Sequence, residues 1–332
     1  MPRWITQDFE VGFFGTRAAM GVFWAGLIVA SGAVGLRCAS IPKAEPTREP
    51  ARAQVIERNP WISGGDARIS VLSLNLFQRP WEREARLLGA SQWISEQSAD
   101  WVLLQEVSQG IGPWKSDPVR SILDRSNSFD VFRGWHELNL GVYQLGLATL
   151  SRQSIAKASS RYQAFRQNDF LNTKGFLVTH IPESPLGEWI VINVHLTHRP
   201  GLPLKEAQFA ELTAAVNQSQ DALPHAHVLL GGDFNATLEN SAFQGFLRAV
   251  GGQTWETSLN PEDQARGTQH TPYTEKCDVE GRSNRIDHFV LVKPKSSEGP
   301  KVAFDQAGLV VHQSEPHISD HCALRVDLIR VP

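Results

Sequence analysis

Cysteine is scarce in this sequence: 332 residues contain only Cys38, Cys277 and Cys322. They form neither a disulfide framework nor a zinc-site spacing, and we expect Cys322, which precedes an apolar run, to serve buried packing. A basic excess is also missing, since 32 Lys+Arg face 35 Asp+Glu and the net charge is −3. General nucleic-acid binders usually have a basic surface, so the composition counts against that class but not against a local basic patch.

One long stretch near the N-terminus has no charge. Ala18 to Leu36 is 19 residues long and is flanked by Arg17 and Arg37. As a helix it would span roughly 28 Å, close to the thickness of a bilayer core. Residues 1–40 are therefore predicted to be a hydrophobic leader, either a membrane anchor or a long signal sequence. We expect a protein that is exported or membrane-anchored, in the cell envelope or secreted.

The next segment has a different composition. Residues 41–60 combine prolines with mixed charges and little apolar content. Such a segment cannot bury a core, so it is predicted to be a linker. The folded part is expected to begin near Trp61, as one domain covering residues 61–332.

Strand-like and helix-like patterns alternate through this domain. Helical patterns cover 81–98, 203–219 and 241–250, and in the first of these Trp81, Ala85 and Leu88 form an apolar stripe. Strand-like runs cover 68–76, 101–104, 141–150, 176–181, 189–196, 228–233, 286–292 and 322–328. The alternation predicts an α+β domain with a mixed sheet core and outer helices. No internal repeat of fixed period accompanies it.

The most informative stretch is Leu-Leu-Gly-Gly-Asp-Phe-Asn at 229–235. A buried strand ends there in two glycines and then presents Asp233 and Asn235. Residues two apart on an extended backbone point to the same side, so a carboxylate and a carboxamide leave the strand together. This pair suits a hard cation, a water and a phosphate oxygen. The alternative is an Asx turn that caps the strand.

Other strand ends also present polar side chains. They are Asn75, Glu106, His195 and Asp287, together with the group 317–321 before the last strand. Each has an ordinary explanation by itself, as a surface acid, a turn residue or a half-buried imidazole. Together they predict one site, because α/β proteins place their sites at the ends of strands.

These residues carry a family resemblance. The segments Leu-Leu-Gln-Glu, Asn-Val-His, Gly-Asp-Phe-Asn, Arg-Ile-Asp-His and Ser-Asp-His occur in the order typical of the endonuclease/exonuclease/phosphatase superfamily. The resemblance covers residues 68–328. It implies an α/β sandwich of two packed mixed sheets flanked by outer helices. It also implies that 61–332 is a catalytic domain that cleaves a phosphoester with Mg²⁺, or with Mn²⁺ or another divalent cation in its place.

The chemistry of the residues suggests a role for each. We expect Glu106, assisted by Asn75, to bind the cation, and His321 to be the general base because a neutral imidazole titrates near physiological pH. Asp287 would orient His321. Asp233 would either position the attacking water or share its proton with His321. Asn235 and His195 would donate to phosphate oxygens, and Asp320 would either serve a second metal or brace the His321 loop.

The substrate is predicted from one further element. Asp169 and Lys174 have the spacing of an Asp-x₄-Lys-Gly element that resembles the neutral sphingomyelinases, which are phospholipase C-type members of the superfamily. By that resemblance Lys174 would contact phosphate or pair with Asp169; the alternative is a surface ion pair. Sphingomyelinases often carry an aromatic hairpin for membrane contact. Trp114 and Trp135 are candidates for it, but in a chain with 10 tryptophans core packing is the more usual role.

The hypothesis is therefore a Mg²⁺-dependent phosphodiesterase that removes a lipid headgroup. Its partner would be a phospholipid or another phosphodiester, at a membrane, and the protein is expected to be a monomer. A nuclease or small-substrate phosphatase on the same scaffold is the alternative, with nucleic acid as partner. A catalytically silent binding module is the third hypothesis.

Overall fold

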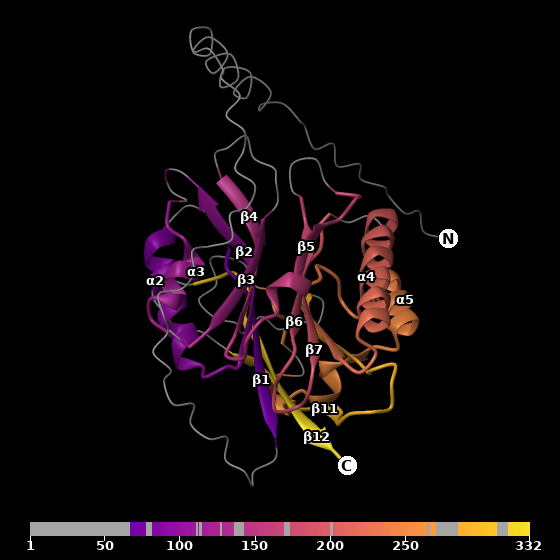
Figure 1. Ribbon diagram of the computed structural model, residues 1–332. Coiled ribbons are helices and arrows are strands. Elements are labelled where there is room, and N and C mark those ends of the chain that lie inside the picture. Colours follow the sequence, from indigo (N-terminus) through magenta and orange to yellow (C-terminus); the bar gives the residue numbers. More distant parts are fainter. Residues whose placement is uncertain are drawn as a thin grey trace, which may run out of the picture. The chain divides into compact units, whose positions relative to one another are not determined.

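The computed structural model describes residues 67–77, 82–110, 112, 115–126, 128–135, 143–168, 173–199, 202–263, 266–269, 285–310 and 318–332 (Figure 1). The predicted leader (1–40) and linker (41–60) lie outside these residues, so both stay predictions. In the part of the chain that the structure describes, no helix is long and apolar enough to cross a membrane.

Two six-stranded sheets form the centre of the fold. The first has the order β11-β12-β1-β2-β4-β3 and the second β5-β6-β7-β8-β10-β9. The strands of the first sheet are β11 (Lys301–Val310), β12 (Ala323–Val331), β1 (Arg68–Asn75), β2 (Trp101–Gly110), β4 (Tyr143–Ser151) and β3 (Asp130–Trp135). Those of the second are β5 (Arg161–Ala164), β6 (Gly175–Ile181), β7 (Trp189–His195), β8 (His227–Asp233), β10 (Asp287–Val292) and β9 (Gln253–Thr254).

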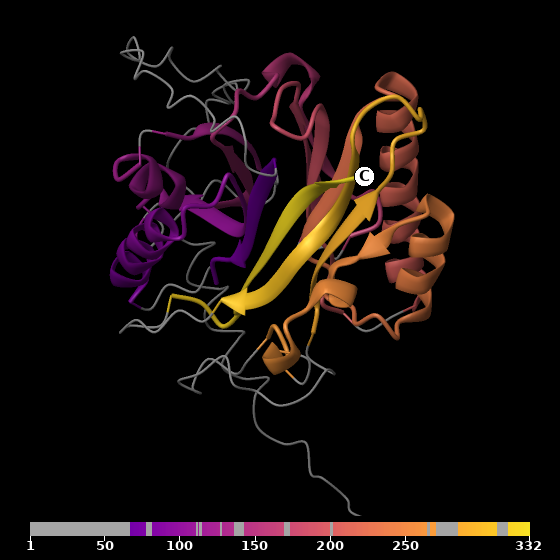
Figure 2. The ribbon, with the colours of Figure 1, turned by 90° about the horizontal axis from the view of Figure 1, so that it is seen from below.

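Each sheet contains one parallel pair, β1 with β2 and β7 with β8, and its other pairs are antiparallel. Both sheets are therefore mixed, as predicted. The helices are α2 (Arg83–Glu96), α3 (Pro118–Leu123), α4 (Leu202–Ala222) and α5 (Ser241–Val250), and short 3₁₀ turns cover Lys157–Ser159, Trp255–Ser258 and Pro261–Asp263. In Figure 2 the purple helices and the orange helices lie on opposite sides of the strands.

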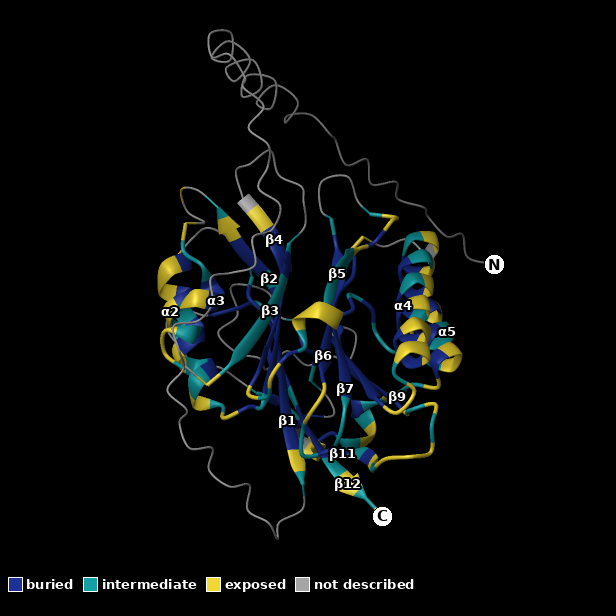
Figure 3. Ribbon diagram, viewed as in Figure 1, coloured by how far each residue is buried: buried dark blue, intermediate teal, exposed yellow. Residues whose placement is uncertain are grey.

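The core has three apolar layers. The middle layer joins the two sheets, and in it the rings of Trp101 on β2 and Trp189 on β7 meet edge to face with centroids 5.3 Å apart. A second layer packs β6, β7 and β8 against α4 and α5, and a third packs β1 and β2 under α2. Because layers cover both faces of the central strands, β7 and β8 are buried along their whole length. Figure 3 shows the central strands mostly in dark blue. The predicted α/β sandwich is confirmed.

The predicted stripe on the first helix is wrong. Ala85 and Leu88 are exposed, and Trp81 lies outside the described residues. The buried face of α2 instead contains Arg83 and Arg86 together with Leu87, Ala90, Ser91 and Ile94. A count of apolar residues assigns arginine to the surface, but here the two guanidinium groups donate to loop carbonyls beneath the helix.

Several short or irregular elements were not predicted from the sequence: β3, β5, β9, β11 and α3. In β11 a register shift between Phe304 and Gln306 interrupts the alternation of buried residues, which removes the period-two signal. Cys322 is buried as expected. It is also disulfide-bonded, which the sequence argument did not predict; Cys38 and Cys277 lie outside the described residues.

Candidate active site

The ends of three neighbouring strands bring three of the predicted residues level with one another. His195 at the end of β7 is the register partner of Asp233 at the end of β8, and Asp233 is the register partner of Asp287 at the start of β10. In the other sheet, Asn75 at the end of β1 pairs with Gln105 on β2. The strand ends therefore meet at one edge of the sandwich.

Asp233 is the centre of this arrangement. Its Oδ2 accepts a hydrogen bond from Asn75 Nδ2 at 3.1 Å and lies 3.3 Å from His195 Nε2 and 4.0 Å from His321 Nε2. On the far side of the imidazole, His321 Nδ1 is 2.8 Å from Asp287 Oδ2. All five side chains are buried. The structure thus brings together residues from four strands and the segment before β12.

The charges of this group shift its pKa values. Burial alone would lower the pKa of His321, but the hydrogen-bonded carboxylate of Asp287 and the charges of Asp233 and Asp320 outweigh it and raise the pKa to about 10. Burial, together with the charge of Asp287, raises the pKa of Asp233 to about 7 against the opposing effect of His321. This differs from the sequence-based expectation of a neutral imidazole at physiological pH. That expectation placed Asp287, Asp233 and Asp320 near His321 but did not weigh the effect of their combined charge on its pKa.

A β-bulge presents Glu106. The register of β2 shifts between Leu104 and Val107, and Glu106 has a φ of 53°, in the left-handed region that non-glycine residues rarely adopt. Gln105 turns inward and donates to Asn193 Oδ1 across the two sheets at 2.8 Å. The bulge therefore separates the buried amide of Gln105 from the carboxylate of Glu106, which is 16% exposed. Glu106, Lys174, Asp320 and Arg86 are called the rim of the site below.

Lys174 lies between Glu106 and His195. Its Nζ is 4.0 Å from Glu106 Oε1 and 2.9 Å from His195 Nε2. Burial lowers the pKa of Lys174, while the charges of Glu106 and Asp233 oppose that shift. Asp169, its predicted partner, lies outside the described residues. The alternative of a surface ion pair does not fit a lysine that is 2% exposed.

Asp320 and Arg86 complete the rim. Burial raises the pKa of Asp320, His321 opposes this, and the negative charge of Glu106 raises it further. Arg86 donates to the Phe77 carbonyl at 2.9 Å and interacts electrostatically with both Asp320 and Glu106. Arg86 was missed in the sequence, and its position in an apolar helix face was the only signal.

Asn235 adopts the Asx turn that was the alternative prediction. Its backbone N–H donates to Asp233 Oδ1 at 2.8 Å, with a φ of 47°. Its Nδ2 donates to the Leu196 carbonyl at 2.9 Å. The turn is compatible with a role of Asp233 in the site. The bond that closes the turn fixes Oδ1 of Asp233 and leaves its Oδ2 to the other site residues.

Two sets of side chains could hold a divalent cation. Asp233, Asp287 and His321 each offer a ligand atom, and these atoms lie within 4.8 Å of one another. Glu106 and Asp320, whose charges repel each other, form a second set of hard oxygen donors. Asn75 lies beside Asp233, with its Nδ2 donating to Asp233 and its Oδ1 accepting from Phe77 N. A bound cation would relieve the repulsion between Glu106 and Asp320, whereas in the first set His321 Nδ1 is already bonded to Asp287.

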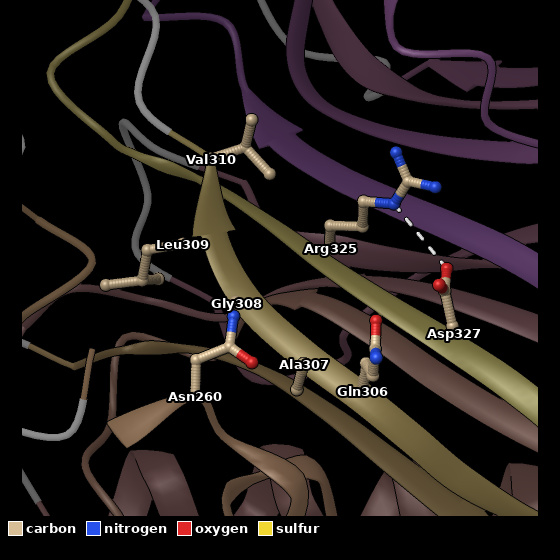
Figure 4. A pocket seen from close by; sticks show the side chains of 8 residues that line it. All are labelled: Asn260, Gln306, Ala307, Gly308, Leu309, Val310, Arg325 and Asp327. Carbon is tan, nitrogen blue, oxygen red and sulfur yellow. Dashed lines mark ion pairs between the residues drawn. The ribbon is translucent and has the colours of Figure 1, made fainter. Parts of the chain in front are cut away.

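Two other features lie apart from these residues. Trp135 packs against the core layer under α2 and α3, so its contacts are those of core packing; Trp114 lies outside the described residues. A cavity of about 240 Å³ beside β11 and β12 contains none of the predicted site residues (Figure 4). Its Arg325 is 3.5 Å from Asp327 and donates to the Gln97 carbonyl.

Comparison with known proteins agrees with this geometry. Residues 72–321 match the profile described as Endonuclease/Exonuclease/phosphatase family. A search of curated proteins finds no match.

Similar solved structures include three proteins with 13–17% identity. An endonuclease/exonuclease/phosphatase from Beutenbergia cavernae has 17% identity and a TM-score of 0.59, over 80% of this chain and 72% of that one. D. rerio TDP2 complexed with single-strand DNA product has 17% identity and a TM-score of 0.58, over 79% of this chain and 99% of that one. A Bacteroides vulgatus endonuclease/exonuclease/phosphatase has 13% identity and a TM-score of 0.61, over 80% of this chain and 100% of that one. At these identities the likeness concerns the fold.

Proposed function

Because the chain belongs to the endonuclease/exonuclease/phosphatase family, we propose that it is a divalent-cation-dependent phosphodiesterase. Members of this family are metal-dependent phosphoesterases. The observation that carries the proposal is the contact of Asp287 with His321 at 2.8 Å, with the other imidazole nitrogen turned toward Asp233. An acid, an imidazole and a second acid in line are the groups that proton transfer to and from a phosphoryl centre requires.

The contacts of Asp233 and His321 and the directions of their pKa shifts support a role for each. Asp233, with a pKa of about 7, is matched to accept the proton of an attacking water near neutral pH. His321 is held as an imidazolium by Asp287, so it stabilises negative charge that develops on the phosphoryl oxygens. From the sequence we expected His321 to be the base and Asp233 to position the water or to share its proton with His321. The raised pKa of His321 favours the carboxylate as the base.

Glu106 and Asp320, with Asn75, would hold the cation. When bound, Mg²⁺ would neutralise phosphate charge and polarise the P–O bond. The ammonium group of Lys174, close to Glu106 and His195, adds a second positive charge on the same side.

The substrate that we propose is a phospholipid headgroup, as in sphingomyelinases. It is supported by the buried position of Lys174 beside Glu106 and by the charge-free stretch 18–36, which would keep the enzyme at a membrane. The disulfide-bonded Cys322 fits an exported protein, because disulfides persist in oxidising compartments. A nucleic-acid end is the second candidate, favoured by the similarity in fold to TDP2 complexed with single-strand DNA product.

A substrate panel tests the proposal. The full chain, purified in detergent, is incubated with sphingomyelin, phosphatidylcholine, a single-stranded DNA oligonucleotide and a small chromogenic phosphodiester, with Mg²⁺ or with EDTA. We expect Mg²⁺-dependent release of a phosphorylated headgroup, and no release with Asp233→Asn. DNA cleavage without headgroup release would favour the nuclease. The absence of hydrolysis of every substrate would contradict the phosphodiesterase.

A further inference from the structure

Lys205 lies in the first turns of α4, outside the set of residues that the sequence motifs single out. Its side chain is 4% exposed, so a charged group is buried beside the catalytic rim. We propose that Lys205 is a positioning residue, whose ammonium group fixes the backbone that leaves β7 and β8 and thereby holds Asp233 and Asn235 in place. The kinetic part of this inference rests on the proposed function.

The ammonium group of Lys205 is fully used by three backbone carbonyls. Nζ donates to Thr197 O at 2.5 Å, to Asn235 O at 2.5 Å and to Phe234 O at 3.2 Å. Thr197 follows the end of β7 by two residues, while Phe234 and Asn235 directly follow Asp233. An ammonium group has three N–H donors, so one side chain links the loops after two neighbouring parallel strands.

These carbonyls depend on such a donor. Burial lowers the pKa of Lys205 to about 8, which shows the cost of placing the charge there. Without the lysine, the buried carbonyls of Thr197 and Phe234 and the partly buried carbonyl of Asn235 would lose a partner, and unpaired buried carbonyls are strongly unfavourable. These hydrogen bonds stabilise the backbone. Because they lie next to Asp233, they also affect the position of Asp233.

Asn235 shows this effect on Asp233 most clearly. It holds a φ of 47°, in the left-handed region that asparagine adopts more readily than other non-glycine residues. Three bonds hold it in this conformation: its N–H donates to Asp233 Oδ1, its Nδ2 donates to Leu196 O, and its carbonyl accepts from Lys205. Since the first of these bonds also orients the Asp233 carboxylate, a change at Lys205 is transmitted to Asp233.

A second residue of the same helix extends the contact. Gln208 Oε1 accepts from Thr197 N at 3.1 Å, and its Nε2 donates to the Gln167 carbonyl at 3.1 Å. Thr197 is thus held through its N–H by Gln208 and through its carbonyl by Lys205. Next to Gln167, Asn168 bonds both the N–H and the carbonyl of Lys174. One face of α4 therefore contacts the segment that follows β7 and also, through Gln167, the segment that leads to Lys174.

The test compares Lys205→Met, which removes the donors and the charge, with Lys205→Arg, which keeps both. Lys293→Met, at an exposed position remote from the rim, is the matched control. Hydrogen exchange is measured for the amides of Asn235 and Leu196, which bond to Asp233, and for that of Val326 in β12 as a distant reference. kcat and KM are measured on the best substrate of the panel.

For Lys205→Met we expect exchange at Asn235 and Leu196 to be at least about tenfold faster while Val326 changes less than about twofold. We expect kcat to fall at least about tenfold with little change in KM. Lys205→Arg should keep most of the exchange protection and most of the kcat of the unchanged chain, and Lys293→Met should behave as the unchanged chain. If Lys205→Met does not fold, Lys205→Gln, which keeps two donors, is used instead, and we expect smaller changes in exchange and kcat from it.

Unchanged exchange at Asn235, or exchange accelerated equally at Val326, would overturn the inference, because the effect would then be absent or only global. A local change in exchange without any substrate turnover in the unchanged chain would support the positioning role and count against the phosphodiesterase alone.

Discussion

Asp287 and His321 are 34 positions apart in the chain, yet Asp287 Oδ2 and His321 Nδ1 are 2.8 Å apart in a buried setting. The contact joins β10 of one sheet to the segment that leads into β12 of the other. Thr268 supports it on both sides, since its Oγ1 accepts from Asp287 N and its carbonyl accepts from Cys322 N. The imidazole is therefore fixed by both sheets.

The first prediction concerns this contact. Asp287→Asn removes the negative charge that most strongly raises the pKa of His321, so this pKa should fall well below 10. Turnover should fall by roughly 10²–10⁴-fold, the usual range for a lost acid–base contribution. NMR titration of His321 and steady-state kinetics measure the two effects. Asp305→Asn, in a partly exposed pair with Arg68, is the control and should leave both unchanged. An unaltered His321 pKa in Asp287→Asn would contradict the account.

The second prediction concerns the dependence of stability on pH. The folded-state pKa of His321 is raised to about 10 from 6.5, so the folded chain retains a proton that the unfolded chain loses. Its stabilisation is complete below about pH 6.5 and is lost as the pH rises to 10, with a slope of at most about 1.4 kcal/mol per pH unit. Urea unfolding with EDTA measures the slope between pH 7 and 10.

The raised pKa of Asp233 acts in a lower window. Its folded value of about 7 lies above the unfolded value of 3.8, so ionisation destabilises the folded chain as the pH rises from 4 to 7. His321→Gln should abolish the decrease between pH 7 and 8; above pH 8 the lowered pKa of Lys205 acts with the opposite sign. A wild-type free energy of unfolding that increases between pH 7 and 8 would contradict the His321 assignment.

The third prediction concerns cation binding. Glu106→Gln removes a carboxylate from the proposed oxygen set, so the Mg²⁺ concentration for half-maximal activity should rise about tenfold or more, in the range seen when a metal's supporting groups are lost. Isothermal titration with Mg²⁺ checks this directly, without substrate. Glu298→Gln, at an exposed position, is the control. Equal Mg²⁺ affinity in Glu106→Gln and the unchanged chain would place the cation elsewhere.

The fourth prediction concerns the glycine before Asp233. Gly232 has a φ of 135°, and a Cβ there would meet the backbone oxygen of Val194 on β7. Gly232→Ala should therefore lower the free energy of unfolding by about 2 kcal/mol or more. Gly245→Ala is the matched control: it lies within α5, where a Cβ meets nothing within 4 Å, and it should stabilise by about 0.5–1 kcal/mol. Urea denaturation measures the free energy of unfolding of both variants. Equal changes in the two variants would contradict the expectation that a Cβ at position 232 collides with β7.

Much of the site could be predicted because its signals are local. Asp233, His195 and Asp287 each end or begin an apolar strand, and strand pairing then brings them level. The sequence cannot show the register shift that re-aims Glu106, since a bulge has no fixed residue pattern. Nor can it show how strongly the combined charge of Asp287, Asp233 and Asp320 raises the pKa of His321, for which the sequence predicts a neutral imidazole.

The sequence also did not predict the buried arginine and lysine side chains. Arg86 and Lys205 are long charged residues on helices, and a hydrophobic pattern assigns them to the surface. Their burial depends on loop carbonyls from distant parts of the chain, such as Ile318 for Arg86 and Asn235 for Lys205. Pairings of this kind are set by tertiary packing and have no local signature. The leader, the linker, export and the monomeric state stay predictions.

The most direct measurement of the central claim is hydrolysis by the full chain in water enriched in ¹⁸O, with Mg²⁺, followed by mass spectrometry of the phosphorylated product. Attack of water on phosphorus, with Asp233 as base, predicts ¹⁸O in the phosphoryl group of the product, and loss of that product in Asp233→Asn and in EDTA. Turnover that persists in Asp233→Asn, or a product whose ¹⁸O lies in the leaving group instead, would contradict the account.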